Sequence, residues 1–92
     1  MSIQWLYDVI ESRRQNPTEQ SYTSSLFAAG LPKIAQKVGE EGTEVVVAAL
    51  AQDNQRLIEE VADLTYHTLV LLAARGLKME EILTELEKRH KQ

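Results

Sequence analysis

The chain has no cysteine, which excludes disulfide bonds and thiol chemistry. Its longest apolar runs, Val45–Ala51 and Leu69–Ala74, are far shorter than the roughly 20 residues that a membrane-spanning helix needs. The first residues have no basic segment followed by an apolar core, so we expect no signal peptide. These absences predict a cytoplasmic protein with no membrane partner.

Basic residues are also few, since 10 Lys and Arg stand against 14 Asp and Glu, for a net charge of −4. This balance argues against nucleic acid as a partner, although it does not exclude a local pocket of basic residues. At this length, residues 1–92 predict a single domain with a thin hydrophobic core. Without disulfides, oligomerisation is the usual remedy for such a core.

Apolar residues recur every three or four positions, and no β pattern survives beside them, so we predict an all-α fold. Ser2 is the expected N-cap of a first helix that ends at Arg13 and Arg14. The other expected helices span residues 24–29, 32–51, 55–75 and 78–91, and residues 16–23 form the only real loop. This pattern predicts a helical hairpin core with four main helices, which assembles into a dimeric helix bundle.

The hairpin is the informative part, because helices 32–51 and 55–75 are joined by only three residues and should pack antiparallel. Glu41 completes the apolar series at positions 34, 38, 41 and 45, so it should point into the buried face. Glu60 and Asp63 break the inward face of the second helix in the same way, followed by His67.

Glu44 and Glu60 lie equally far from the hairpin midpoint, about eight residues or ~12 Å along each helix. Glu41 and Asp63 lie one turn further out, so four carboxylates should converge at one level. That convergence is costly, because desolvated carboxylates need a proton, a cation or a metal ion. Lys37, one turn before Glu41, cannot neutralise all four.

A site built from carboxylate oxygens suits Mg²⁺, or Mn²⁺ as an alternative, whereas zinc favours Cys or His. Mg²⁺ that keeps several waters is suited to phosphate substrates. The chain has no Gly-rich phosphate loop and no Ser/His/Asp or Cys/His nucleophile set. Phosphate would therefore be held through the metal ion and through basic side chains.

Six side chains are candidates for substrate binding, and each has an ordinary structural alternative. Cations at helix ends are common without a ligand, a loop tyrosine can stack on a base or cover the core, and a histidine on an inward face can be a core residue. Lys37 can contact phosphate or reduce the repulsion among the carboxylates. The candidates are Lys37, Arg13, Arg14, Tyr22, His67 and Arg75.

The spacing Glu40-Glu41-x-x-Glu44, followed by Glu60-x-x-Asp63, resembles the EExxE…ExxD signature of the all-α nucleoside triphosphate pyrophosphohydrolases, the MazG-like superfamily. The flanking segments at residues 21–23, 30–34, 37–41 and 60–72 resemble the phosphoribosyl-ATP pyrophosphatase family within it. The resemblance covers residues 3 to about 88.

This resemblance implies hydrolysis of phosphoribosyl-ATP to phosphoribosyl-AMP and pyrophosphate, the second step of histidine biosynthesis, with Mg²⁺. It implies that Glu41, Glu44, Glu60 and Asp63 bind the metal ion. It further implies that Glu40 is an additional site carboxylate or the general base, and that the chain is a homodimer.

Two other functions stay open at this point. The first is a MazG-like housecleaning hydrolase, which would act on noncanonical or deoxynucleoside triphosphates with the same metal site. The second is a non-enzymatic helical dimer whose acidic face binds a basic protein partner.

Overall fold

The computed structural model describes residues 1–90, and this part of the chain contains five helices and no strand. They are α1 (Ile3–Gln15), α2 (Tyr22–Ala29), α3 (Leu31–Ala51), α4 (Asn54–Ala74) and α5 (Met79–Arg89). The all-α prediction is confirmed. Position 91, where the last helix was expected to end, lies outside the described residues.

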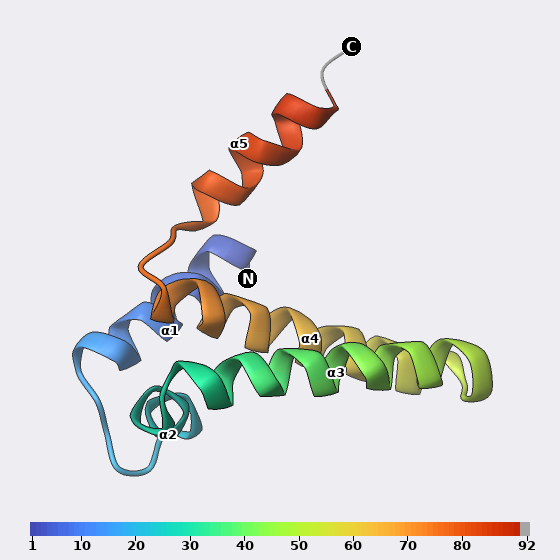
Figure 1. The fold of residues 1–92 in the computed structure, drawn as a ribbon, viewed down its shortest axis with the longest axis horizontal. Helices are drawn as coiled ribbons and strands as arrows, with labels where there is room; N and C mark the ends of the chain where they lie inside the picture. The colour runs from blue at the N-terminus through green and yellow to red at the C-terminus, as the bar shows by residue number, and fades with distance from the viewer. Residues whose placement is uncertain (91–92) are drawn as a thin grey trace.

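The long helices α3 and α4 lie side by side as the expected antiparallel hairpin, and α1 and α2 pack at its open end (Figure 1). The turn between α3 and α4 is closed by Asp53, whose carboxylate accepts the backbone N–H of Arg56 at 2.9 Å as an N-cap. None of the five helices is sufficiently long and apolar to cross a membrane.

Helix α2 begins earlier than the sequence predicted. The Ser21 hydroxyl accepts the backbone N–H of Ser24 at 3.1 Å, which satisfies a free donor at the helix start. Tyr22 and Thr23, expected in the loop, therefore lie in the first turn of α2. This N-cap fixes both side chains against α4, where they become part of the site.

The core lies where α1, α2 and the open half of the hairpin meet. Its buried side chains are Tyr7 and Ile10 from α1, Leu26 from α2, Ile34 from α3, and Leu69, Val70 and Ala73 from α4. Helix α5 has no buried residue and extends away from the body (Figure 1). Among the described residues, the short α2 contributes a buried side chain to the core, whereas α5 contributes only the partly buried Met79 at its first position. The expected core of four main helices stays a prediction.

Candidate active site

Three of the four predicted carboxylates meet between the two helices of the hairpin. Glu41 of α3 and Glu60 and Asp63 of α4 each offer a carboxylate oxygen, and these oxygens all lie within 4.8 Å of one another. Glu41 and Glu60 are buried, with 6% and 5% of their surface exposed, while Asp63 is open to solvent. The inward direction predicted for Glu41 and Glu60 is confirmed. We call these three residues the carboxylate cluster.

Each buried carboxylate has one oxygen paired and one left without a partner. The Oε1 atom of Glu41 lies 3.5 Å from Lys37 Nζ, and the Oε1 atom of Glu60 accepts from Arg56 Nη2 at 2.6 Å. The Oε2 atoms of both glutamates are buried without a hydrogen-bond partner among the described residues. Buried polar atoms rarely remain unsatisfied, and two anionic oxygens beside a third carboxylate fit a divalent cation.

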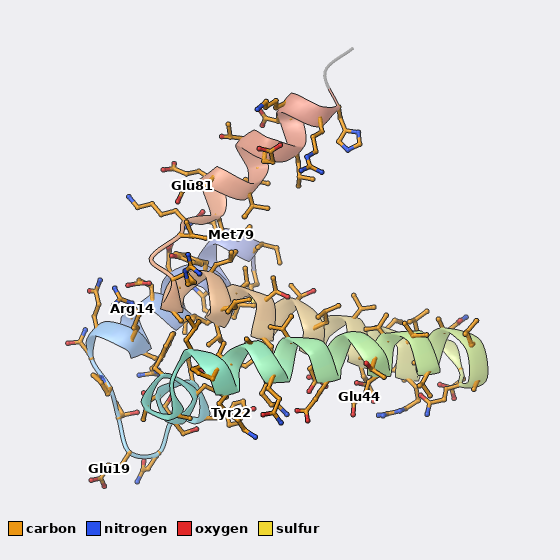
Figure 2. The ribbon with its side chains drawn as sticks, viewed as in Figure 1. Arg14, Glu19, Tyr22, Glu44, Met79 and Glu81 are labelled. Atoms are coloured by element: carbon orange, nitrogen blue, oxygen red, sulfur yellow. The ribbon has the colours of Figure 1, made fainter. Side chains whose placement is uncertain are left out.

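Glu44, the fourth predicted ligand, lies outside the carboxylate cluster. It is exposed on α3 (Figure 2). Together with Arg56 and Glu60 it lines a shallow hollow that also includes Gln52 at the end of α3. Three residues along a helix turn a side chain about 60° away from the direction of Glu41, which accounts for the difference. Glu40 is also exposed, and one of its oxygens lies 3.9 Å from Lys37 Nζ.

Lys37 lies at the rim of the carboxylate cluster. Partial burial by itself lowers its pKa, but the neighbouring Tyr22 and the carboxylates of Glu41 and Glu40 outweigh this effect, and the net pKa is raised. The ammonium group is therefore protonated at neutral pH. It is placed where it can contact a phosphate oxygen as well as the carboxylates.

Arg56 is the single basic residue between Glu40 and Asp63 in the sequence. In the structure its guanidinium pairs with Glu59 at 2.7 Å and with Glu60 at 2.6 Å. The hydrogen bond to Glu59 and the charges of Glu60 and Glu44 raise the pKa of Arg56. The sequence could have predicted these ion pairs, because Arg56 lies three residues before Glu59 and four before Glu60 on one helix.

Tyr22 and His67 are brought together from α2 and α4, with 3.1 Å between the phenol oxygen and Nε2. His67 is buried and its Nδ1 lies 2.8 Å from the backbone carbonyl oxygen of Asp63. Beside them, the hydroxyls of Tyr66 and Thr23 are hydrogen-bonded. Sequence reasoning missed Tyr66 and Thr23, because this contact joins residues on different helices.

The three candidate arginines lie away from the carboxylate cluster within one chain. Arg14 pairs with Glu11 at 2.5 Å and lines a separate hollow beside Lys78, and Figure 2 shows it on α1, well apart from Glu44. Arg13 is exposed on the same helix. Arg75 follows Glu60 by fifteen positions, or ~22 Å of helix.

Comparison with known proteins agrees with the geometry of the site. The family model described as phosphoribosyl-ATP pyrophosphohydrolase matches residues 3–90. A phosphoribosyl-ATP pyrophosphatase from Lacticaseibacillus casei is 56% identical over 88 residues, which cover 96% of this chain and 80% of the relative. Those from Listeria monocytogenes and Pyrobaculum calidifontis are 57% and 51% identical, covering 91% and 94% of this chain and 81% and 92% of the relatives. The chain therefore belongs to the phosphoribosyl-ATP pyrophosphohydrolase family, as its acidic signature and flanking segments indicated.

Proposed function

We propose that this chain hydrolyses phosphoribosyl-ATP to phosphoribosyl-AMP and pyrophosphate, and that Glu41, Glu60 and Asp63 hold the divalent cation it needs. The observation that supports this proposal most is the pair of buried carboxylate oxygens that have no hydrogen-bond partner among the described residues, in a chain of this family. Mg²⁺ is the proposed ion because every donor is a carboxylate oxygen, and Mn²⁺ is the alternative. Glu44, at the rim, is the proposed fourth ligand.

In the reaction, a water oxygen forms a bond to the α-phosphorus while the bond from this phosphorus to the α–β bridging oxygen breaks. The exposed Glu40 carboxylate is the proposed acceptor of the water's proton. Protonated Lys37 donates a hydrogen bond to a phosphate oxygen and holds the chain of phosphates in line. When bound, the cation neutralises the charge that develops on the pyrophosphate leaving group.

The phosphoribosyl end of the substrate carries a further phosphate, which needs its own cations. Arg13, Arg14 and Arg75 are the proposed contacts, since they are cations that lie outside the carboxylate cluster. Tyr22, which is exposed, is proposed to contact the nucleoside part, and the buried His67 to lie behind it. A pocket shared between two subunits would be a second way to bring these arginines near the carboxylate cluster.

We also propose that the chain acts as a homodimer. Near the hairpin turn, α3 and α4 expose a set of large apolar side chains, which we call the hairpin patch: Val46, Leu50, Ile58 and Val61, at 56%, 84%, 61% and 44% exposure. Burial of such side chains is worth about 1.5–3 kcal/mol each. A second hairpin packed on the patch would form a four-helix bundle. A cytoplasmic location stays a prediction.

The test measures the release of pyrophosphate in the presence of Mg²⁺. Phosphoribosyl-ATP and each member of a panel of deoxynucleoside triphosphates are assayed separately as substrates. We expect kcat/KM for phosphoribosyl-ATP to exceed the others by about 100-fold or more, since only this substrate fills the second phosphate site. Equal rates on the panel would instead support a housecleaning hydrolase. No turnover of any nucleotide would overturn the proposal.

A further inference from the structure

Tyr22 is an exposed aromatic residue with an anchored hydroxyl. The side chain is 53% exposed at the first position of α2, yet its phenol oxygen lies 3.1 Å from the buried Nε2 atom of His67. An exposed tyrosine gains little by itself from such a fixed orientation. The anchoring therefore points to a use for the open part of the ring.

The direction of each hydrogen bond at His67 follows from its neighbours. Nδ1 lies 2.8 Å from the backbone carbonyl oxygen of Asp63, which can only accept, so Nδ1 carries the proton. In that tautomer Nε2 accepts, and the Tyr22 hydroxyl donates to it. His67 thus links Tyr22 on α2 to the turn of α4 that carries Asp63.

Two further rings hold the orientation of Tyr22. The Tyr66 ring lies 6.2 Å from it, centre to centre, with 25° between the planes, and the His67 ring meets it edge-on at 6.0 Å and 78°. The Tyr66 hydroxyl is in turn hydrogen-bonded to Thr23, the residue after Tyr22. The ring is therefore packed from the α4 side and open elsewhere.

His67 places this ring next to the carboxylate cluster. Its Nε2 lies 3.1 Å from the Tyr22 hydroxyl, and its Nδ1 lies 2.8 Å from the backbone carbonyl oxygen of Asp63, a member of the cluster. Lys37 lies 3.5 Å from Glu41 in the same cluster. The Tyr22 ring and Lys37 therefore both border the carboxylate cluster, an arrangement that suits a nucleoside next to its phosphates.

We infer that His67 is a positioning residue that presents the open face of Tyr22 as a stacking platform for the adenine base of the substrate. The inference rests on the proposed function and adds the base-binding element to it. Bases stack readily on aromatic side chains, and a ring fixed before binding loses less conformational entropy. Tyr22 contacts the substrate, whereas His67 acts through Tyr22.

The test compares the binding of AMP and of pyrophosphate by calorimetry, with Mg²⁺, in the parent and in Tyr22→Leu. We expect Tyr22→Leu to weaken AMP binding about tenfold and to raise KM for phosphoribosyl-ATP by a similar factor. Pyrophosphate binding and kcat should stay near the parent values. Trp5→Leu is the matched control, because Trp5 is equally exposed at 53% but lies on α1.

The positioning role is tested from both ends of the hydrogen bond. Tyr22→Phe keeps the ring and loses the donor, and His67→Gln alters the acceptor; each should weaken AMP binding about threefold or more. Adding Tyr22→Leu to His67→Gln should cost less than Tyr22→Leu costs in the parent. If His67→Gln fails to fold, Tyr22→Phe carries the test, because it leaves the buried imidazole untouched.

Three results would overturn the inference. The first is parent-like AMP binding in Tyr22→Leu, and the second is an equal loss of pyrophosphate binding, which would indicate general damage to the site. The third is parent-like AMP binding in Tyr22→Phe, which would remove the role of His67. A parent enzyme that binds AMP but does not turn over phosphoribosyl-ATP would contradict the proposed function instead.

Discussion

At the scale of single residues, the site depends on two carboxylates that are costly to bury. Glu41 and Glu60 each keep one buried oxygen without a hydrogen-bond partner, while Lys37 and Arg56 pair only with the other oxygen. Such unsatisfied anionic oxygens destabilise the fold until a cation binds. Binding of the proposed cation would therefore add to the stability of the hairpin.

Glu41→Gln should show how far the stability and the activity each depend on the charge of Glu41, since the amide keeps the shape of the side chain and removes its charge. We expect Mg²⁺ at about 100 times its Kd to raise the Tm of the parent by roughly 10 °C and that of Glu41→Gln far less. Hydrolysis of phosphoribosyl-ATP should fall by about 100-fold or more. Thermal unfolding with and without Mg²⁺ measures the change in Tm. Glu87→Gln is the control, because Glu87 is exposed on α5, away from the carboxylate cluster. An unchanged Mg²⁺ shift in Glu41→Gln would contradict the ligand assignment.

At the scale of helices, the fold depends on the joints between them. Gly30 ends α2 and directly precedes α3, with a φ of +96° that non-glycine residues rarely adopt. Tyr7 on α1 donates a hydrogen bond of 2.6 Å to the backbone carbonyl of Leu77, which ties the link between α4 and α5 to the core. The first joint sets the turn from α2 into α3, and the second anchors the segment from which α5 extends.

Gly30→Ala should destabilise the fold by about 1–2 kcal/mol through backbone strain. Packing does not contribute, because a Cβ atom at Gly30 would have its nearest neighbour, Pro32 Cδ, at 3.9 Å. Gly39→Ala is the matched control: it lies within α3, where an added Cβ meets nothing within 4 Å, and it should stabilise by up to about 1 kcal/mol. Urea unfolding gives both values. Equal effects of the two variants would show that the backbone at residue 30 is not strained.

The Tyr7 joint predicts a loss of stability at alkaline pH. Burial, and then the charge of Glu11, raise the pKa of Tyr7 above its ordinary value near 10. Below pH 10 the tyrosine is neutral in both states and its stabilisation is complete; as the pH rises further, the unfolded chain ionises first and stability falls. Tyr7→Phe should lose about 1 kcal/mol at pH 7 and show a smaller further loss at pH 11. Urea unfolding at both pH values is the measurement, and a parallel decline in the two proteins would contradict it.

At the scale of the whole molecule, one chain leaves much apolar surface open. The hairpin patch at one end and the half-exposed Leu83 and Leu86 of α5 are not covered within residues 1–90. Helix α5 also extends away from the body (Figure 1). A second copy of the chain would bury these faces and compensate for the small core.

Leu50→Glu should therefore convert the proposed dimer to a monomer, because Leu50 is 84% exposed in one chain and would be charged within the interface. We expect the parent to sediment as a dimer and Leu50→Glu as a less stable monomer. Gln52→Glu adds the same charge at the hairpin turn without removing an apolar side chain, and should remain dimeric. A monomeric parent would overturn the homodimer.

Local patterns in the sequence were enough to predict the main helices, the hairpin and the inward direction of Glu41 and Glu60. These features follow from a repeat of 3.6 residues and a three-residue connection, which are local properties of the chain. Two features became visible only in the folded chain: α5 contributes no buried residue, and Tyr22 reaches His67. These depend on how helices cross and on contacts between residues far apart in the chain, which no local period encodes.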